Sequence, residues 1–109
     1  MKTTTNRVND TLVVSFEGDV DLESSNQARE ALLRAVREGA RVVVDLSAVP
    51  YIDSSGIASL IEAFQTARSA GKTLTLAAVN QAALRAFKLA RLDRVFTIAD
   101  SLDDALAAG

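Results

Sequence analysis

The stretch Val42-Val43-Val44-Asp45-Leu46 constrains the fold of this chain more than any other part of the sequence. A short, continuous β-branched run is typical of a strand that is covered on both faces near the centre of a sheet. Apolar residues at helical spacing occur on both sides of it, before Gly39 and after Gly56. Strands that are joined through helices run parallel, so the pattern predicts an α/β fold with this strand at its centre.

Further strand patterns occur at both ends of the chain. Two stretches rich in Thr and Val, Lys2 to Val8 and Thr11 to Phe16, are separated by Asn9-Asp10, which predicts an antiparallel hairpin at the start. The first stretch is polar enough for an edge strand. Two more strands are expected at Thr73 to Ala77 and near Val95 to Ile98. The sequence therefore predicts a mixed sheet of four to five strands.

About four helices are expected between and after these strands. Ser24 and Gln27 have the spacing of a capping box before the first helix, and Gly71 follows the end of the second. Asn80 is a suitable cap for the third helix, and a short helix starts near Ser101. Their predicted buried faces are formed by Ala28, Ala31, Leu32, Ala35 and Val36, by Ile57, Leu60, Ile61 and Phe64, and by Ala83, Leu84, Phe87 and Ala90. No repeat or linker interrupts the pattern, so residues 1–109 are expected to form a single domain.

Composition excludes several classes of protein. The chain has 49% hydrophobic and 24% charged residues, as soluble globular domains do, and no apolar run reaches the roughly 20 residues of a membrane span. Its N-terminus lacks the apolar core of a signal peptide. The net charge of −2 and the pI near 5 give no electrostatic footprint for nucleic acid, which normally shows as Lys and Arg clustered on one face. We expect a cytoplasmic protein that contacts neither nucleic acid nor a membrane directly.

The absence of both Cys and His removes most catalytic chemistry. The chain has no thiolate nucleophile, no imidazole base and no zinc site of the usual kind. No convergent set of acid, base and nucleophile can be assembled from the remaining residues. We therefore expect no enzymatic activity, no catalytic residue and no cofactor.

Two other motifs have simpler explanations than ligand binding. Gly71-Lys72-Thr73 resembles the end of a phosphate-binding loop, but Thr66 stands where that motif needs its first glycine, and a helix here precedes a strand. Asp19, Asp21 and Glu23 offer oxygen ligands for a cation, yet acidic groups before a helix are usually solvated and favour its N-terminus. We expect a helix stop at the first motif and no metal at the second.

The turn Asp53-Ser54-Ser55-Gly56 is the strongest candidate for a functional site. Asp and Ser are favoured helix caps, and that role alone would explain them. Serine hydrolysis is excluded because the chain has no His and no Gly-x-Ser-x-Gly pattern. What remains is a hydroxyl at the positive end of a helix, which can accept a phosphate or a partner's acidic group. From the residues alone, a capping role and a regulatory role both stay open.

Three segments of the chain carry a family resemblance. They are Gly18-Asp19-Val20-Asp21, the stretch from Val44 to Ile57, and Leu84-Arg85-Ala86-Phe87, of which the middle one is the most specific. In these segments and in the order of its elements the chain resembles STAS domains, in particular the free-standing bacterial anti-sigma factor antagonists. One departure is Ala90-Arg91-Leu92, where many relatives have a small residue and Gly before the Leu.

The resemblance implies a STAS-like fold and a phosphorylation switch. In that family the residue after the Asp of this turn is phosphorylated by a kinase that is itself the anti-sigma factor, which places the role on Ser54. The unphosphorylated form captures the anti-sigma factor, and a metal-dependent serine phosphatase resets the switch. The partner-binding residues implied by the resemblance are Asp21, Asp53, Ser54, Ser55, Gly56 and Ile57.

An alternative function is compatible with the same turn. STAS subunits of lipid-transport ABC ATPases and of sensory scaffold complexes also place a Ser or Thr there. The chain could therefore be a permanent accessory subunit of such a complex.

Overall fold

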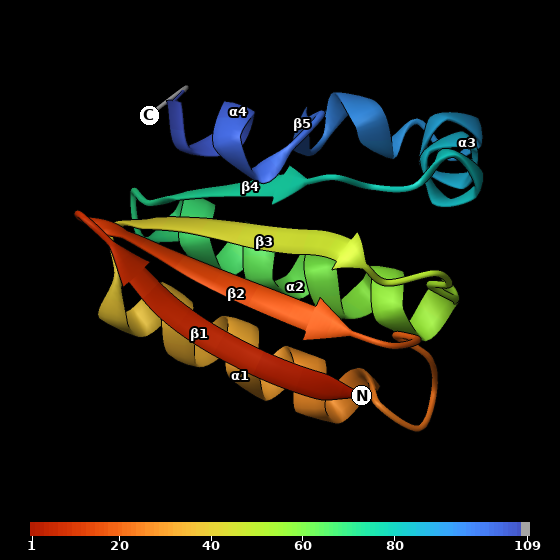
Figure 1. Cartoon of the computed structure of the whole chain (residues 1–109), viewed down its shortest axis with the longest axis horizontal. Coiled ribbons are helices and arrows are strands. Elements are labelled where there is room, and N and C mark those ends of the chain that lie inside the picture. The colour runs from red at the N-terminus through yellow and green to blue at the C-terminus, as the bar shows by residue number, and fades with distance from the viewer. Residues whose placement is uncertain (108–109) are drawn as a thin grey trace.

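The computed structural model describes residues 1–107, which form a five-stranded mixed sheet with helices packed on it (Figure 1). The strands lie in the spatial order β1 (Lys2–Val8), β2 (Thr11–Glu17), β3 (Arg41–Ala48), β4 (Thr73–Ala77) and β5 (Thr97–Ala99). β1 runs antiparallel to β2, and the other neighbouring pairs are parallel. The predicted α/β fold, with an N-terminal hairpin and β3 at its centre, is confirmed.

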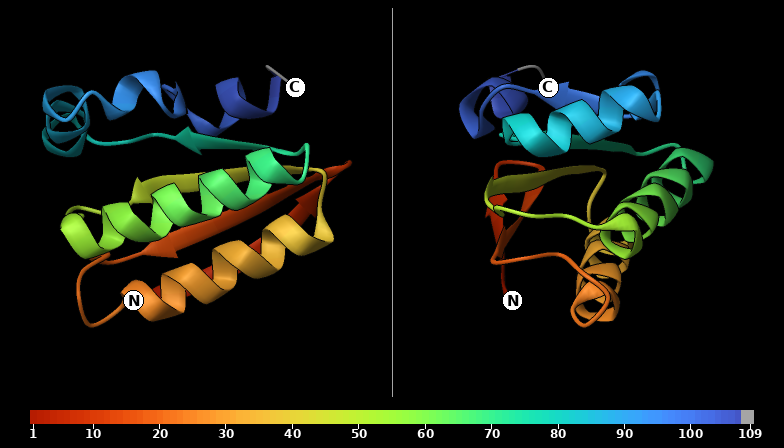
Figure 2. Two further views of the ribbon diagram at one scale, coloured as in Figure 1. Left: turned by 180° about the vertical axis from the view of Figure 1, so that it is seen from behind. Right: turned by 90° about the vertical axis from the view of Figure 1, so that its right-hand side faces the viewer.

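The helices cover the two faces of the sheet unequally. They are α1 (Ser25–Glu38), α2 (Ser54–Ser69), α3 (Gln81–Leu89) and α4 (Leu102–Ala107), with the short 3-10 helix η1 (Leu92–Arg94) after α3. Helices α1 and α2 lie side by side on one face (Figure 2). Helix α4 packs on the opposite face, against Val13, Val43 and Ala77. None of the helices within residues 1–107 is long and apolar enough to cross a membrane.

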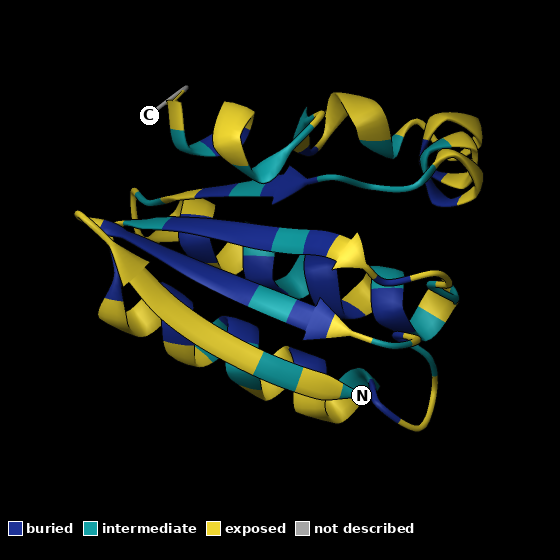
Figure 3. Cartoon of the chain, viewed as in Figure 1, coloured by how far each residue is buried: buried dark blue, intermediate teal, exposed yellow. Residues whose placement is uncertain are grey.

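Strand β3 is apolar at nearly every position because both of its faces are buried. Val42, Val44 and Leu46 belong to the core beneath α1 and α2, and Val43 belongs to the smaller core beneath α4. All four side chains are at most 1% exposed. The edge strand β1, in contrast, is exposed along nearly its whole length (Figure 3). The sequence reading of a central strand and a polar edge strand is confirmed.

The Gly71-Lys72-Thr73 motif ends a helix, as predicted. Gly71 has a φ of +71°, its N–H donates to the Arg68 carbonyl, and the Lys72 N–H donates to the Ala67 carbonyl. This left-handed glycine closes α2 in the pattern known as a Schellman motif. The Lys72 ammonium donates to the carbonyls of Val36 and Arg37 at the end of α1, which favours a positive charge.

Two details of the C-terminal part differ from the expectation. The strand expected near Val95 to Ile98 is present as β5, at Thr97–Ala99. Val95 and Phe96 lie outside β5, because the chain turns through η1 and brings the Phe96 ring into the core. That ring lies edge-on to Phe64, with centroids 5.4 Å apart, and stacks on Phe87 at 5.9 Å. Ala90 was expected on the buried face of α3, but it is the exposed residue that follows the helix end.

The predicted capping box at Ser24 and Gln27 is also wrong. Ser24 does precede α1, but its side chain makes no cap hydrogen bond to that helix. Its hydroxyl accepts from the Asp21 N–H (3.0 Å) and lies 2.9 Å from the Asp19 carbonyl, to which it can donate. The Gln27 amide donates instead to the Met1 carbonyl. The preceding loop thus uses the hydroxyl that a capping box would have given to the helix.

Candidate functional site

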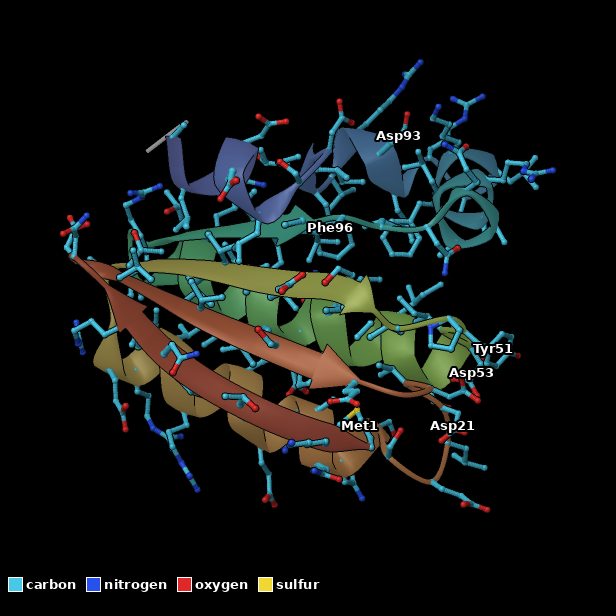
Figure 4. The ribbon with its side chains drawn as sticks, viewed as in Figure 1. Met1, Asp21, Tyr51, Asp53, Asp93 and Phe96 are labelled. Carbon is cyan, nitrogen blue, oxygen red and sulfur yellow. The ribbon has the colours of Figure 1, made fainter. Side chains whose placement is uncertain are left out.

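Two loops meet where the parallel strands β2 and β3 end (Figure 4). Val20 of the first loop pairs in parallel with Ile52 of the second. The Val20 N–H donates to the Tyr51 carbonyl (3.0 Å), and the Asp53 N–H donates to the Val20 carbonyl (3.1 Å). Asp21 and Asp53 are distant in the sequence, and the resemblance assigns both to the partner surface. The two loops hold them at the same end of the sheet.

Asp53 connects the start of α2 to the neighbouring loop. Its Oδ1 accepts from the N–H groups of Ser55 (2.9 Å) and Gly56 (3.0 Å), and its Oδ2 accepts from the Leu22 N–H (3.1 Å). The first two bonds satisfy helix N–H groups that no preceding turn can reach. Asp53 is therefore the cap of α2, and both of its carboxylate oxygens accept hydrogen bonds that hold the scaffold.

Ser54 is the first residue of α2 and is exposed. Because Asp53 supplies the cap, the Ser54 hydroxyl is not needed for it. Within residues 1–107 this hydroxyl has no hydrogen-bond partner. The capping explanation that stayed open from the sequence is therefore wrong for Ser54, and its hydroxyl faces solvent at the positive end of a 16-residue helix.

The next three residues are less exposed than Ser54. Ser55 and Ile57 are half-buried, and Gly56 is buried. A Cβ on Gly56 would lie 2.4 Å from the Val20 carbonyl oxygen and 2.8 Å from an Ile52 methyl carbon. The close backbone approach that this glycine permits is thus to the chain's own loop.

A buried serine, which sequence reasoning missed, joins the starts of the two long helices. Ser59 is 7% exposed, and its hydroxyl lies 3.1 Å from the Ser25 carbonyl of α1 and 3.2 Å from the Ser55 carbonyl of α2. One hydroxyl proton can serve either acceptor. Its signal in the sequence was a polar residue on an otherwise apolar helix face.

The acidic residues of the first loop also stabilise the backbone. Asp21 Oδ1 accepts from the N–H groups of Glu23 (3.1 Å) and Ser24 (3.2 Å). Asp19 and Glu23 are exposed. Across residues 1–107, no group of three such side chains is placed to hold a metal ion.

Large apolar side chains stand exposed beside these carboxylates. Leu22 is 75% exposed and Tyr51 is 55% exposed. Both lie in the loops that carry Asp21 and Asp53. They were not among the predicted site residues, although an apolar residue in a polar loop is a visible sequence signal. Tyrosine is enriched among the side chains that anchor protein interfaces, and an exposed leucine adds apolar area beside it.

Helix α3 adds a positively charged region at the same end of the sheet. The Asn80 amide, before α3, donates to the carbonyls of Val49 and Pro50, both at 3.0 Å. Four of the chain's 12 Lys and Arg residues follow within α3 and η1 or between them. They are Arg85, Lys88, Arg91 and Arg94, all exposed. These four residues recur at a regular three-residue spacing, a signal that sequence reasoning missed.

Comparison with known proteins identifies the family. The model of the STAS domain matches residues 2–105. The chain belongs to the STAS domain family. Among its relatives, the anti-sigma-B factor antagonist of Listeria monocytogenes is 28% identical over 93 residues, which cover 84% of this chain and 82% of that protein.

Solved structures share the fold of this STAS domain. An anti-sigma factor antagonist from Mycobacterium paratuberculosis superposes with a TM-score of 0.90 at 28% identity, covering 98% of this chain and 92% of the other. A sulfate transporter family protein from Wolinella succinogenes has a TM-score of 0.81 at 19% identity, covering 93% and 85%. The second likeness concerns the fold alone.

Proposed function

We propose that this STAS domain is an anti-sigma factor antagonist and that the Ser54 hydroxyl is its switch. In the unphosphorylated form it binds an anti-sigma factor that has serine kinase activity, and phosphorylation of Ser54 ends the binding. The observation that carries this proposal is the exposed hydroxyl without an internal partner, fixed next to the Asp53 cap. The relatives that are named antagonists support it.

The chemistry requires little from this chain. The kinase transfers the γ-phosphoryl group of ATP to Ser54 Oγ, the hydroxyl proton leaves to a base or to solvent, and ADP is released. A metal-dependent serine phosphatase hydrolyses the phosphoserine and restores the hydroxyl. The chain, which has no His and no Cys, supplies only the acceptor and no enzymatic activity of its own. We place this cycle in the cytoplasm.

The proposed partner surface comprises Asp21, Asp53, Ser54, Ser55, Gly56 and Ile57. These residues divide between contact and support. Ser54 is exposed, whereas Gly56 is buried and keeps the loop of Val20 against α2. We add Leu22 and Tyr51 as apolar contacts, because both are largely exposed in the loops that carry Asp21 and Asp53.

A phosphate on Ser54 would act mainly across the interface. It adds about −1.5 to −2 charges at the start of a helix, where the dipole favours them. The nearest helix N–H groups, those of Ser55 and Gly56, already bond to Asp53, so the phosphate stays solvated beside that carboxylate. A partner surface that fits a small neutral hydroxyl must then desolvate this charge or meet it with its own acidic groups.

Phosphate mapping tests this proposal. The protein is incubated with ATP and each anti-sigma kinase of its source organism, and the modified residue is located by mass spectrometry. We expect phosphate on Ser54, none on Ser54→Ala, and continued modification of the matched Ser55→Ala variant. Ser54→Ala should still bind the kinase, because it keeps the neutral surface. Phosphate on Ser55 or Thr66 would refute the assignment. A stable complex with a transport ATPase and no kinase reaction would instead favour the accessory-subunit function.

A further inference from the structure

Helix α3, η1 and Val95 present a basic surface whose charges have no partner in the described chain. We define the α3–η1 surface as Arg85, Lys88, Leu89, Arg91, Arg94 and Val95. The ion pairs within residues 1–107 join Arg29 to Glu62 and Arg41 to Asp10, and neither involves this surface. Asp93 is the one acidic residue between Arg85 and Arg94. The positive charges are therefore free to act on another molecule.

The same surface exposes two apolar side chains. Leu89 is 88% exposed, and Val95 is 43% exposed. Neither is needed in the core, which takes Ala83 and Phe87 from α3. Arginine is enriched at protein interfaces, and an exposed leucine beside it adds apolar area that a partner can bury.

Arg91 has a strained backbone on this surface. Its φ is +60°, in the left-handed region that glycine adopts without strain. The helix ends here in any case, since the Arg91 N–H donates to the Lys88 carbonyl. An arginine at this exposed position costs stability that a glycine would not, which points to a use for its side chain.

The start of α3, which leads into the α3–η1 surface, adjoins the loop that carries Asp53. The Asn80 amide ties the start of α3 to the carbonyls of Val49 and Pro50. The right-hand view of Figure 2 looks onto this end of the sheet, where α3 and the starts of α1 and α2 face the same way. One partner can therefore contact both regions.

We propose that the α3–η1 surface is a second docking region for the partner protein, and that it receives an acidic patch with an apolar recess for Leu89. This inference rests on the proposed function, because the partner is the anti-sigma kinase that Ser54 serves. A protein fits better than a membrane, since two apolar side chains are a small anchor for a lipid surface. It also fits better than nucleic acid, because the acidic loops alongside repel a polyanion.

Charge reversal with a matched control tests the inference. Arg85→Glu with Lys88→Glu reverses two exposed charges on α3, and Arg34→Glu with Arg37→Glu does the same, at the same spacing, on α1. Arg34 and Arg37 lie toward the other end of α1, far from the switch. Binding of the unmodified protein to the purified kinase with ADP is measured by calorimetry at low and moderate salt. We expect the α3 variant to bind at least about tenfold more weakly with less salt dependence, and the α1 variant to stay within about twofold.

Each other outcome overturns the inference in a recognisable way. If wild type binds the kinase and both variants bind as it does, or both lose affinity equally, the second docking region is refuted and the proposed function stands. If wild type forms no complex with any kinase and carries no phosphate on Ser54, both proposals fail. If the kinase complex is unaffected but the α3 variant loses binding to phosphatidylserine vesicles or to duplex DNA, the surface serves lipid or nucleic acid instead.

Discussion

The loops that carry Asp21 and Asp53 and the α3–η1 surface use their charged residues in opposite ways. In the loops, the carboxylates of Asp21 and Asp53 accept hydrogen bonds from backbone N–H groups of their own chain. On the α3–η1 surface, the cationic groups make no ion pair within residues 1–107. The carboxylates of Asp21 and Asp53 therefore stabilise the structure of the loops. The basic groups of the α3–η1 surface stay available for another molecule.

This difference separates residues that support the fold from residues that contact a partner. A residue whose polar atoms are satisfied internally should affect stability first and binding second. A residue whose polar atoms are unpartnered should affect binding with little cost to stability. Ser54 is the exception among the loops, because its hydroxyl is exposed and unused. By this reasoning it belongs functionally with the α3–η1 surface.

The strongest test of the scaffold side is Gly56→Ala. The new Cβ would lie 2.4 Å from the Val20 carbonyl oxygen, and because that atom is backbone it cannot swing away. We expect a loss of about 3 kcal/mol in the free energy of unfolding, measured by urea denaturation. The control is Gly71→Ala, where a Cβ meets no atom within 4 Å and only the φ of +71° is unfavourable, at about 1 kcal/mol. Equal losses would mean that the contact with Val20 does not constrain the loops.

Substitution of Asp53 should lower the free energy of unfolding by less than Gly56→Ala does. Replacing Asp53 by Ala removes the cap and the bond to Leu22, so we expect a loss of about 2 kcal/mol in thermal or urea unfolding. Asp53→Asn keeps one capping oxygen but turns an amide toward the Leu22 N–H, and should lose about half as much. If Asp53→Ala retained full stability, the distinction between scaffold and contact residues would fail.

Arg91→Gly should shift stability in the other direction. Relief of the left-handed backbone should raise the free energy of unfolding by about 0.5 to 1 kcal/mol, while affinity for the kinase falls. Denaturation and calorimetry on the same sample give both values. A variant that is less stable than wild type would show that the Arg91 side chain supports the fold.

Much of the fold could be predicted because local and global signals agree. The β-branched run of β3, the polar β1 and the glycine after α2 each required one environment, and each was found in it. The loop around Ser24 could not be read this way, because a hydroxyl near a helix start has several acceptors within reach. Phe96 escaped prediction because two distant aromatic rings, Phe64 and Phe87, set its place.

The position of the candidate site could be predicted, but the separate roles of Asp53 and Ser54 within it could not. The sequence indicated the turn at Asp53 and Ser54, but either residue could have capped α2. The assignment depends on the loop of Leu22, whose N–H binds the second oxygen of Asp53. Such a contact between distant segments leaves no periodic signal in the sequence.

The affinity of the anti-sigma kinase for the two forms of the protein tests the central claim most directly. Calorimetry with ADP compares the unmodified protein with protein that is stoichiometrically phosphorylated on Ser54. A like charge at about 4 Å with an effective dielectric near 20 costs about 4 kcal/mol, so we predict at least a roughly hundredfold loss of affinity, with amide NMR shifts confined to the loops around Asp21 and Ser54. Equal affinity of the two forms, or shifts throughout the sheet, would contradict the account.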